Sequence, residues 1–206
     1  MKLKRAICFV LVAFALSVSV KAQERVQEPA SRTILAVKSN ALYDLGTALN
    51  YGIEVPLGTR FSLDWEHTFP WWHIGNKYCL QFLTLDLEFR WWINPRKGAL
   101  TGHFVGVYGL WGKADLQWGT KGCYQVPSAW SAGLRYGYNF RLSAGWRLEL
   151  SAAAGFASVD FQHYVPSDDW TMLWQDPSQM GTLSYWGPVN LSVSFVKTID
   201  IKPRKK

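Results

Sequence analysis

The stretch QFLTLDLEFRWW, residues Gln81 to Trp92, alternates apolar and polar side chains. Its apolar positions are Leu83, Leu85, Leu87, Phe89 and Trp91. The positions between them are Thr84, Asp86, Glu88, Arg90 and Trp92. A period of two predicts a β-strand, because successive side chains point to opposite faces of a sheet. Three successive charges on one face suit a strand with lipid on its apolar side and a polar interior on its charged side, although a soluble barrel with reversed faces also alternates.

Aromatic residues are abundant in the chain, and charged residues are few. The 206 residues include 12 Trp, 9 Tyr and 11 Phe, and 18% are charged, which is below the usual quarter. After residue 22 there is no run of 18 apolar residues, so we expect no membrane-spanning helix. This composition favours a single domain of the transmembrane β-barrel class.

The formal net charge of +7 comes from the two ends of the chain. Residues 1–22 contribute +4 and residues 197–206 contribute another +4, which leaves a net charge of −1 for the body between them. The body therefore lacks a basic stripe of the kind that binds nucleic acid, and we expect no nucleic-acid partner.

The first 22 residues have the order of a secretory signal peptide. Basic residues at the start precede an apolar run over residues 6–20, and Val20, Lys21 and Ala22 form a small-x-small cleavage site. We expect export, with cleavage after Ala22. Residues 23–32 then form a flexible leader, residues 33–199 a barrel, and residues 200–206 a basic periplasmic tail.

Eight strand-like segments follow the leader, at residues 33–43, 47–57, 60–69, 80–92, 100–112, 129–140, 146–161 and 188–198. Short turns at 58–59, 94–98 and 141–145 alternate with longer loops at 70–79, 113–128 and 164–187, and only the connection at 44–46 departs from this pattern. Tyr and Trp gather near the segment ends, as they do at membrane–water interfaces. We predict an eight-stranded antiparallel up-and-down transmembrane β-barrel in the lipid of an outer membrane.

Ten charged side chains fall on the predicted interior face. They are Lys38, Glu54, Asp64, Glu66, Asp86, Glu88, Arg90, Arg135, Arg147 and Glu149. Buried charges must be paired, and eight strands leave an interior just wide enough for side chains to fill. We therefore predict a salt-bridged polar plug and not a porin. A path for protons or ions through the same groups is the alternative.

Cys79 and Cys123 both fall near the long-loop end of the predicted strands. Cys79 lies at the top of the fourth predicted strand and Cys123 in the loop after the fifth. Because these two strands are expected to be neighbours, and an exported protein can keep a disulfide, we consider a bridge between the two cysteines. Two free thiols are the alternative.

The four histidines are scattered singly, so we predict neither a metal site nor a cofactor. A lipid-A-modifying enzyme would need a His, a Ser and an acid at one rim of the barrel. The sequence offers His163 with Asp160, and His67 with Glu66. Such residues occur at the strand ends of almost any barrel, and we predict no catalytic residues.

The predicted loop 164–187 combines aromatic residues with acids. Its aromatic members are Trp170, Trp174, Tyr185 and Trp186. Exposed aromatics of this kind suit a surface protein or glycan as partner, or else they rest on the membrane rim. We predict a structural or surface-interaction role, in adhesion or assembly; the alternatives are a lipid-A-modifying enzyme, a narrow channel and a soluble periplasmic lipocalin-like carrier. The sequence does not fix an oligomeric state.

Several runs resemble an uncharacterised family of small outer-membrane β-barrel proteins from Bacteroides-type bacteria. The runs are VKSNALYD (37–44), LNYGIEVPL (49–57), EFRWW (88–92), LTGHFVGVY (100–108) and SAGLRYGY (131–138). The family is known only as a domain of unknown function, and the resemblance covers about residues 37–164. It implies a small outer-membrane barrel and no known activity.

Overall fold

The computed structural model describes residues 32–75, 77–93, 100–119, 122–143, 145–167 and 172–201. The predicted signal peptide, the leader up to residue 31 and the tail from residue 202 lie outside these residues. The elements are β1 (Arg32–Asn40), α2 (Ala41–Leu45), β2 (Asn50–Leu57), β3 (Phe61–Thr68), β4 (Trp71–Ile74), β5 (Tyr78–Trp92), β6 (Gly102–Trp118), β7 (Cys123–Ser143), β8 (Trp146–Pro166) and β9 (Leu173–Ile201). No helix within this described part is long and apolar enough to cross a membrane.

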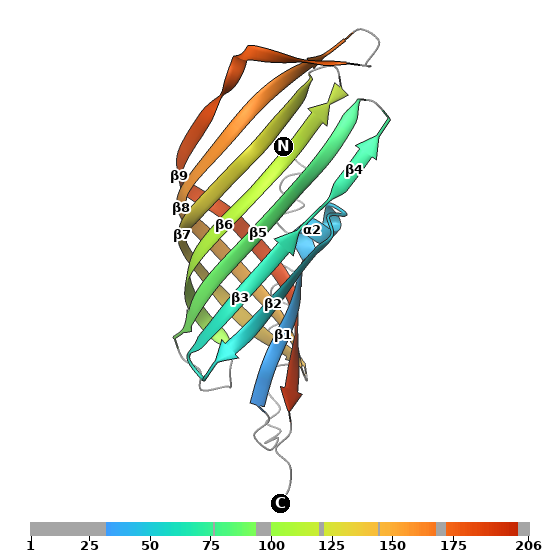
Figure 1. The fold of residues 1–206 in the computed structure, drawn as a ribbon. Helices are drawn as coiled ribbons and strands as arrows, with labels where there is room; N and C mark the ends of the chain where they lie inside the picture. Colours follow the sequence, from blue (N-terminus) through green and yellow to red (C-terminus); the bar gives the residue numbers. More distant parts are fainter. Residues whose placement is uncertain are drawn as a thin grey trace, which may run out of the picture. The chain divides into compact units, whose positions relative to one another are not determined.

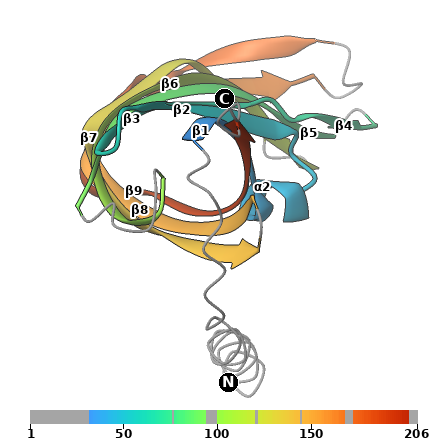
Figure 2. The same cartoon turned by 90° about the horizontal axis from the view of Figure 1, so that it is seen from below.

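The strands form one antiparallel sheet that closes into a ring (Figures 1 and 2). Their order is β3-β2-β1-β9-β8-β7-β6-β5-β4, and an additional pairing of β3 with β5 joins the two ends. After β3 ends at Thr68, the chain passes Phe69 and Pro70 and continues as β4 along the same neighbour, β5. The ring itself therefore contains eight strands, and the predicted all-β, antiparallel, up-and-down architecture is confirmed.

The two faces of the ring have the reverse of the usual polarity. Along β5, Asp86, Glu88, Arg90 and Trp92 are buried. The alternate positions Leu85, Leu87, Phe89 and Trp91 are exposed. Neighbouring strands follow the same rule, because directly paired residues share a face. The positions of the row Arg90–Gly106–Arg135–Ala153 face inward, and those of the row Phe89–Val107–Leu134–Ala154 face outward.

Strands β6 to β9 are longer than predicted, and the predicted loops 113–128 and 164–187 are wrong. Leu116 pairs with Tyr124 across β6 and β7, and Ala157 pairs with Tyr185 across β8 and β9. Only residues 119–122 and 167–172 connect these strands. These segments keep a period of two, and pairing satisfies their backbone hydrogen bonds, so they extend the sheet. The predicted loop 70–79 contains β4, and the connection after β1 contains α2, whose first turn is capped by the side chain of Asn40.

The extra length forms a second region, which we call the projecting sheet. It comprises β4 together with residues 78–83 of β5, 113–118 of β6, 123–128 of β7, 156–166 of β8 and 173–187 of β9. The pairing of β3 with β5 ends at Thr68 and Thr84, and β1 pairs only with the part of β9 from Ser194 onward. The projecting sheet therefore extends past β1 to β3 at one end of the ring (Figure 1).

We predict that a side chain at Gly106 destabilises the ring. A Cβ atom there would collide with the Glu88 carboxylate, whereas a Cβ atom at Gly109 on the same strand meets nothing within 4 Å. Gly106→Ala should lower the free energy of unfolding by about 1–3 kcal/mol through overpacking. The matched variant Gly109→Ala should stay within about 0.5 kcal/mol of the parent. Urea unfolding midpoints measure both; equal midpoints would contradict the packing described.

Candidate functional site

The interior of the ring holds a continuous network of ion pairs. Lys38 Nζ lies 3.1 Å from Glu54, 2.7 Å from Asp64 and 3.3 Å from Glu149. The Arg90 guanidinium contacts the same three carboxylates at 3.2, 2.7 and 3.0 Å. Two cations on β1 and β5 thus share three anions on β2, β3 and β8, and the network connects opposite walls of the ring.

Arg90 also extends the network toward β7. Its Nη2 atom lies 2.8 Å from Glu88 Oε2, and Arg135 Nη1 lies 2.7 Å from the same oxygen. Arg135 Nη2 then donates to Asp86. The structure therefore brings nine of the ten predicted interior charges together. The tenth, Arg147, is buried nearer the end of the ring that carries the short connections after β2 and β7, which we call the turn end. There it donates to Leu100 O and Thr101 Oγ1.

Neutral groups complete the coordination of the carboxylates. Ser62 Oγ donates to Glu54 at 2.5 Å, and Trp92 Nε1 donates to Ser62 Oγ at 2.9 Å. Asn139 Nδ2 donates to Glu149 at 3.3 Å. Hydrogen bonds of this kind reduce the cost of burying charge, which pairing alone offsets only when the geometry is good.

An aromatic layer adjoins the charged side chains, and this layer was not predicted from the sequence. Trp92, Leu100 and Phe104 pack with Ala36 and Val196 in a fully buried cluster. The Arg90 guanidinium lies 4.2 Å from the centroid of the Phe104 ring, which links this layer to the ion pairs by a cation–π contact. The run HFVGVYGLWG looks apolar on both faces, so its inward members could not be separated by pattern. Side chains of both layers fill the interior of the ring.

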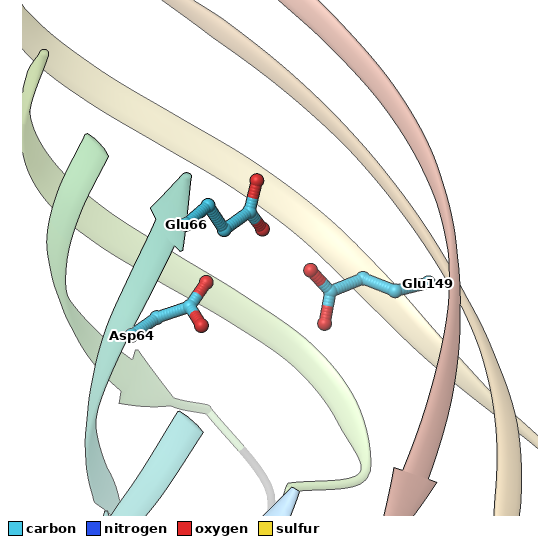
Figure 3. A group of neighbouring side chains, drawn as sticks. All are labelled: Asp64, Glu66 and Glu149. Carbon is cyan, nitrogen blue, oxygen red and sulfur yellow. The ribbon is translucent and has the colours of Figure 1, made fainter. Parts of the chain in front are cut away.

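Three carboxylates, those of Asp64, Glu66 and Glu149, converge within the ring (Figure 3). One oxygen from each lies within 4.8 Å of the others, a spacing that a metal ion could use. The Lys38 ammonium lies 2.7, 3.8 and 3.3 Å from the same three groups. The convergence is therefore explained by the protein's own cation, and we assign no metal to it.

Acids outnumber bases in the network. The ten interior charges comprise six carboxylates and four bases, a formal difference of two negative charges. Among the described residues, one oxygen each of Asp64, Asp86 and Glu88 is buried without a hydrogen-bond donor. Glu66 has the weakest pairing, at 3.8 Å from Lys38, and its side chain is 20% exposed.

The outward face of the ring carries aromatic side chains at two levels. At the level of the projecting sheet, Trp130 and Phe156 lie 5.2 Å apart, and Phe156 and Trp186 lie 5.3 Å apart. At the turn end, Tyr138 and Phe140 lie 4.4 Å apart. Apolar side chains occupy the outward positions between these two levels.

The polarity of the two faces is exchanged in the projecting sheet beyond the outward aromatic row of Trp130, Phe156 and Trp186. The inward row Trp72–Leu80–Leu116–Tyr124 is apolar. The adjacent outward row Gln81–Asp115–Gln125–Gln162 is polar. Leu80 and Arg90 lie on the same face of one uninterrupted strand, so the inner surface changes from charged to apolar between Thr84 and Phe82.

The predicted aromatic contact surface does not form a single loop. Trp170 lies outside the described residues, and Trp174, Tyr185 and Trp186 belong to β9. Tyr185 and Trp186 are consecutive residues of a strand and so point to opposite faces. Trp186 joins the outward aromatic row with Phe156, and Tyr185 faces inward opposite Ala157.

Cys79 and Cys123 are free thiols, and the disulfide that we considered is not formed. Both residues are paired with Gln117, one from each side, so β6 lies between them. Strands in a sheet are about 4.8 Å apart, which separates the two Cα atoms by about 10 Å, beyond the reach of a disulfide. Burial and the carboxylate of Asp115 raise the pKa of the Cys123 thiol to about 11, which leaves it protonated and unreactive at neutral pH.

The histidine pairs considered for catalysis are not brought together. His67 and Glu66 are adjacent on a strand and face opposite sides, and His67 Nδ1 lies 2.8 Å from Thr84 O. His163 lies 3.7 Å from Asp176, whereas Asp160 accepts a hydrogen bond from Thr182 on the other face. Neither pair suggests a nucleophile with its base.

A closed antiparallel ring with a charged interior and an apolar exterior thus defines the class of this molecule. The chain matches the family described as "Protein of unknown function (DUF3575)" over residues 7–199 and belongs to it. The resemblance to an uncharacterised family is therefore confirmed. No curated protein and no solved structure shows a significant match to the chain.

Arg90 is expected to be required for stability. Its side chain is 0% exposed and neutralises four carboxylates. Arg90→Met should lower the free energy of unfolding by about 3–5 kcal/mol, because buried anions would lose their partner. The exposed turn variant Arg60→Met, with the same chemical change, should stay within about 0.5 kcal/mol. Urea titration of the folded protein provides the measurement, and an unchanged midpoint for Arg90→Met would refute the network.

The excess of acids predicts different costs for two isosteric substitutions. Glu66→Gln removes a charge that is weakly paired, so stability should stay within about 1 kcal/mol of the parent or rise. Glu88→Gln removes the negative charge that Arg90 and Arg135 share, and should cost about 3 kcal/mol or more. The same urea titration compares the two variants. A larger loss of stability for Glu66→Gln than for Glu88→Gln would contradict the weak pairing of Glu66 described above.

Proposed function

We propose that this chain is an eight-stranded β-barrel of an outer membrane, with a sealed polar interior and a structural or surface-interaction role. The observation that carries the proposal is the reversed polarity of the ring. Charged side chains are buried inside, while outward side chains such as Leu87, Val107 and Leu134 are more than half exposed. In water a continuous apolar exterior of this kind would cause the protein to aggregate, whereas in a bilayer it would contact lipid chains.

The height of the apolar exterior supports the same proposal. Trp130 and Phe140 mark its two aromatic levels on β7 and are ten residues apart. At about 3.4 Å per residue and a typical tilt of about 40°, ten residues span about 26 Å. That agrees with the apolar band of about 25 Å in outer-membrane barrels. Trp and Tyr favour the edges of such a band.

The filled interior argues for a role other than conduction. A water-filled channel requires a wide lumen, whereas here ion pairs and the cluster around Trp92 and Phe104 occupy the ring. The projecting sheet, whose outer face carries Gln81, Asp115 and Gln162, would then stand in water outside the membrane. It offers the surface for a protein or glycan partner. The predicted signal peptide, with cleavage after Ala22, would supply the route of export.

Cell fractionation followed by electrophoresis tests the membrane assignment. The protein should be found in the outer-membrane fraction, and the unboiled sample should migrate faster than the boiled one, because a closed barrel resists the detergent. Recovery in the soluble periplasmic fraction without a shift in migration would contradict the proposal and favour a soluble carrier.

A matched pair of variants tests which surface meets lipid. Leu87 and Leu173 are exposed to nearly the same extent, 52% and 53%, but Leu87 lies mid-ring on β5 and Leu173 at the tip of the projecting sheet. Leu87→Arg should destabilise the barrel in lipid vesicles by about 2–4 kcal/mol, and Leu173→Arg by less than about 1 kcal/mol. Equal effects would mean that no bilayer surrounds the ring.

A further inference from the structure

The projecting sheet contains an apolar groove on its inner face. The groove has a volume of about 720 Å³. It is lined by Gly46, Thr47, Trp72, Ile74, Tyr78, Cys79, Leu80, Leu116, Gln117, Trp118, Gly122 and Tyr124. These residues come from β4 to β7 on one side and from the connection after α2 on the other, so the space is a cleft between two parts of the fold.

The apolar character of this groove is specific to one face of one region. On β5, the inward residues Tyr78 and Leu80 are apolar. Cys79 lies between them on the strand, faces outward and pairs with Gln117 of β6. Further along the same inward face, Asp86, Glu88 and Arg90 are charged. Because neighbouring positions on the same strand take opposite polarity, the groove cannot be a by-product of general hydrophobicity.

The apolar surface of the groove remains accessible. Trp118 is 75% exposed and Ile74 is 69% exposed, although both face the concave side. The rings of Tyr78 and Trp118 meet edge to face at 5.4 Å and form an aromatic wall. At the ring side, Tyr43 of α2 and Phe82 of β5 lie 6.3 Å apart, between the groove and the charged interior. Large exposed aromatic side chains in a concave site are typical of a surface that binds another molecule.

We propose that this groove binds an uncharged, largely apolar small molecule with aromatic or extended hydrocarbon character. No charged side chain is among the described residues that line it, and the lining is mainly apolar and aromatic, so a charged ligand would lose its hydration for little electrostatic gain. Its volume falls within the range of about 300–1,000 Å³ typical of small-molecule sites. Thr47, in the connection after α2, supplies a polar group that could orient one end of the ligand. A partner protein would instead need about 800 Å² of contact surface, which a cleft of this size does not present.

The ligand site extends the proposed function without depending on it, because the groove lies in the projecting sheet, away from the apolar exterior of the ring. The matched positions for a test are Leu80 and Gln81. They are consecutive on β5 and face opposite sides of the sheet, so Leu80→Asp and Gln81→Asp add the same charge inside and outside the groove.

The probe is N-phenyl-1-naphthylamine, an uncharged aromatic compound that fluoresces in apolar surroundings. It is titrated into full-length protein in lipid nanodiscs, and the signal of empty nanodiscs is subtracted. We expect saturable binding of one probe per protein, weakened at least about tenfold by Leu80→Asp and changed less than about twofold by Gln81→Asp. The faster migration of the unboiled variants verifies that they are folded. Trp118→Ala, at a side chain too exposed to be needed for folding, should also weaken binding.

Two results would overturn the inference. One is a signal that rises linearly with probe concentration and is the same in all variants, since that is partitioning into lipid. The other is a parent protein that is dimeric by native mass spectrometry, does not bind the probe and becomes monomeric with Leu80→Asp; the groove would then be covered by a second copy of the chain. Recovery of the protein from the soluble fraction would refute the membrane proposal alone, because the same titration can be made in buffer.

Discussion

The sharing of three carboxylates by two cations is the interaction on which the rest of the ring depends. Glu54, Asp64 and Glu149 each contact both Lys38 and Arg90. These groups reach the centre from strands far apart in sequence, so they can be paired only when the ring is closed in one register. A shift of one residue in any of these strands would move its charge to the outer face. The ion pairs thereby select one closure among many that backbone hydrogen bonding alone would permit.

The small and aromatic residues of the interior follow from that constraint. Gly106 leaves the space that the Glu88 carboxylate occupies, and Gly137 leaves space for the Phe104 ring. The Phe104 ring in turn lies against Arg90. Glycine therefore weakens the strands locally but permits large side chains from neighbouring strands to enter a narrow interior. Glycine therefore lies beside large side chains in the ring, because a long side chain needs space that a side chain on the neighbouring strand would occupy.

One strand passes through two environments without a break in its periodicity. The inward side chains of β5 are charged from Asp86 to Arg90 and apolar from Phe82 to Tyr78, and the outward side chains change in the opposite sense. The exchange separates a ring with an apolar exterior from a sheet with a polar exterior. The alternation of Tyr78 and Leu80 with Cys79 and Gln81 was visible in the sequence, but residues 70–79 were predicted to be a loop and the strand to begin at residue 80.

The sequence by itself determined the parts of the strands that form the ring, their antiparallel order and the ten charges that face inward, because a period of two assigns each side chain to a face regardless of its neighbours. It also located the short connections after β2 and β7, where Gly and polar residues interrupt the alternation, but not those between β6 and β7 and between β8 and β9. Only the tertiary structure decided which charges meet, that β6 separates Cys79 from Cys123, that Trp174, Tyr185 and Trp186 belong to a strand, and that an apolar groove forms beside α2. These features depend on the register between strands and on the closure of the ring, which join residues distant in the chain and leave no local pattern.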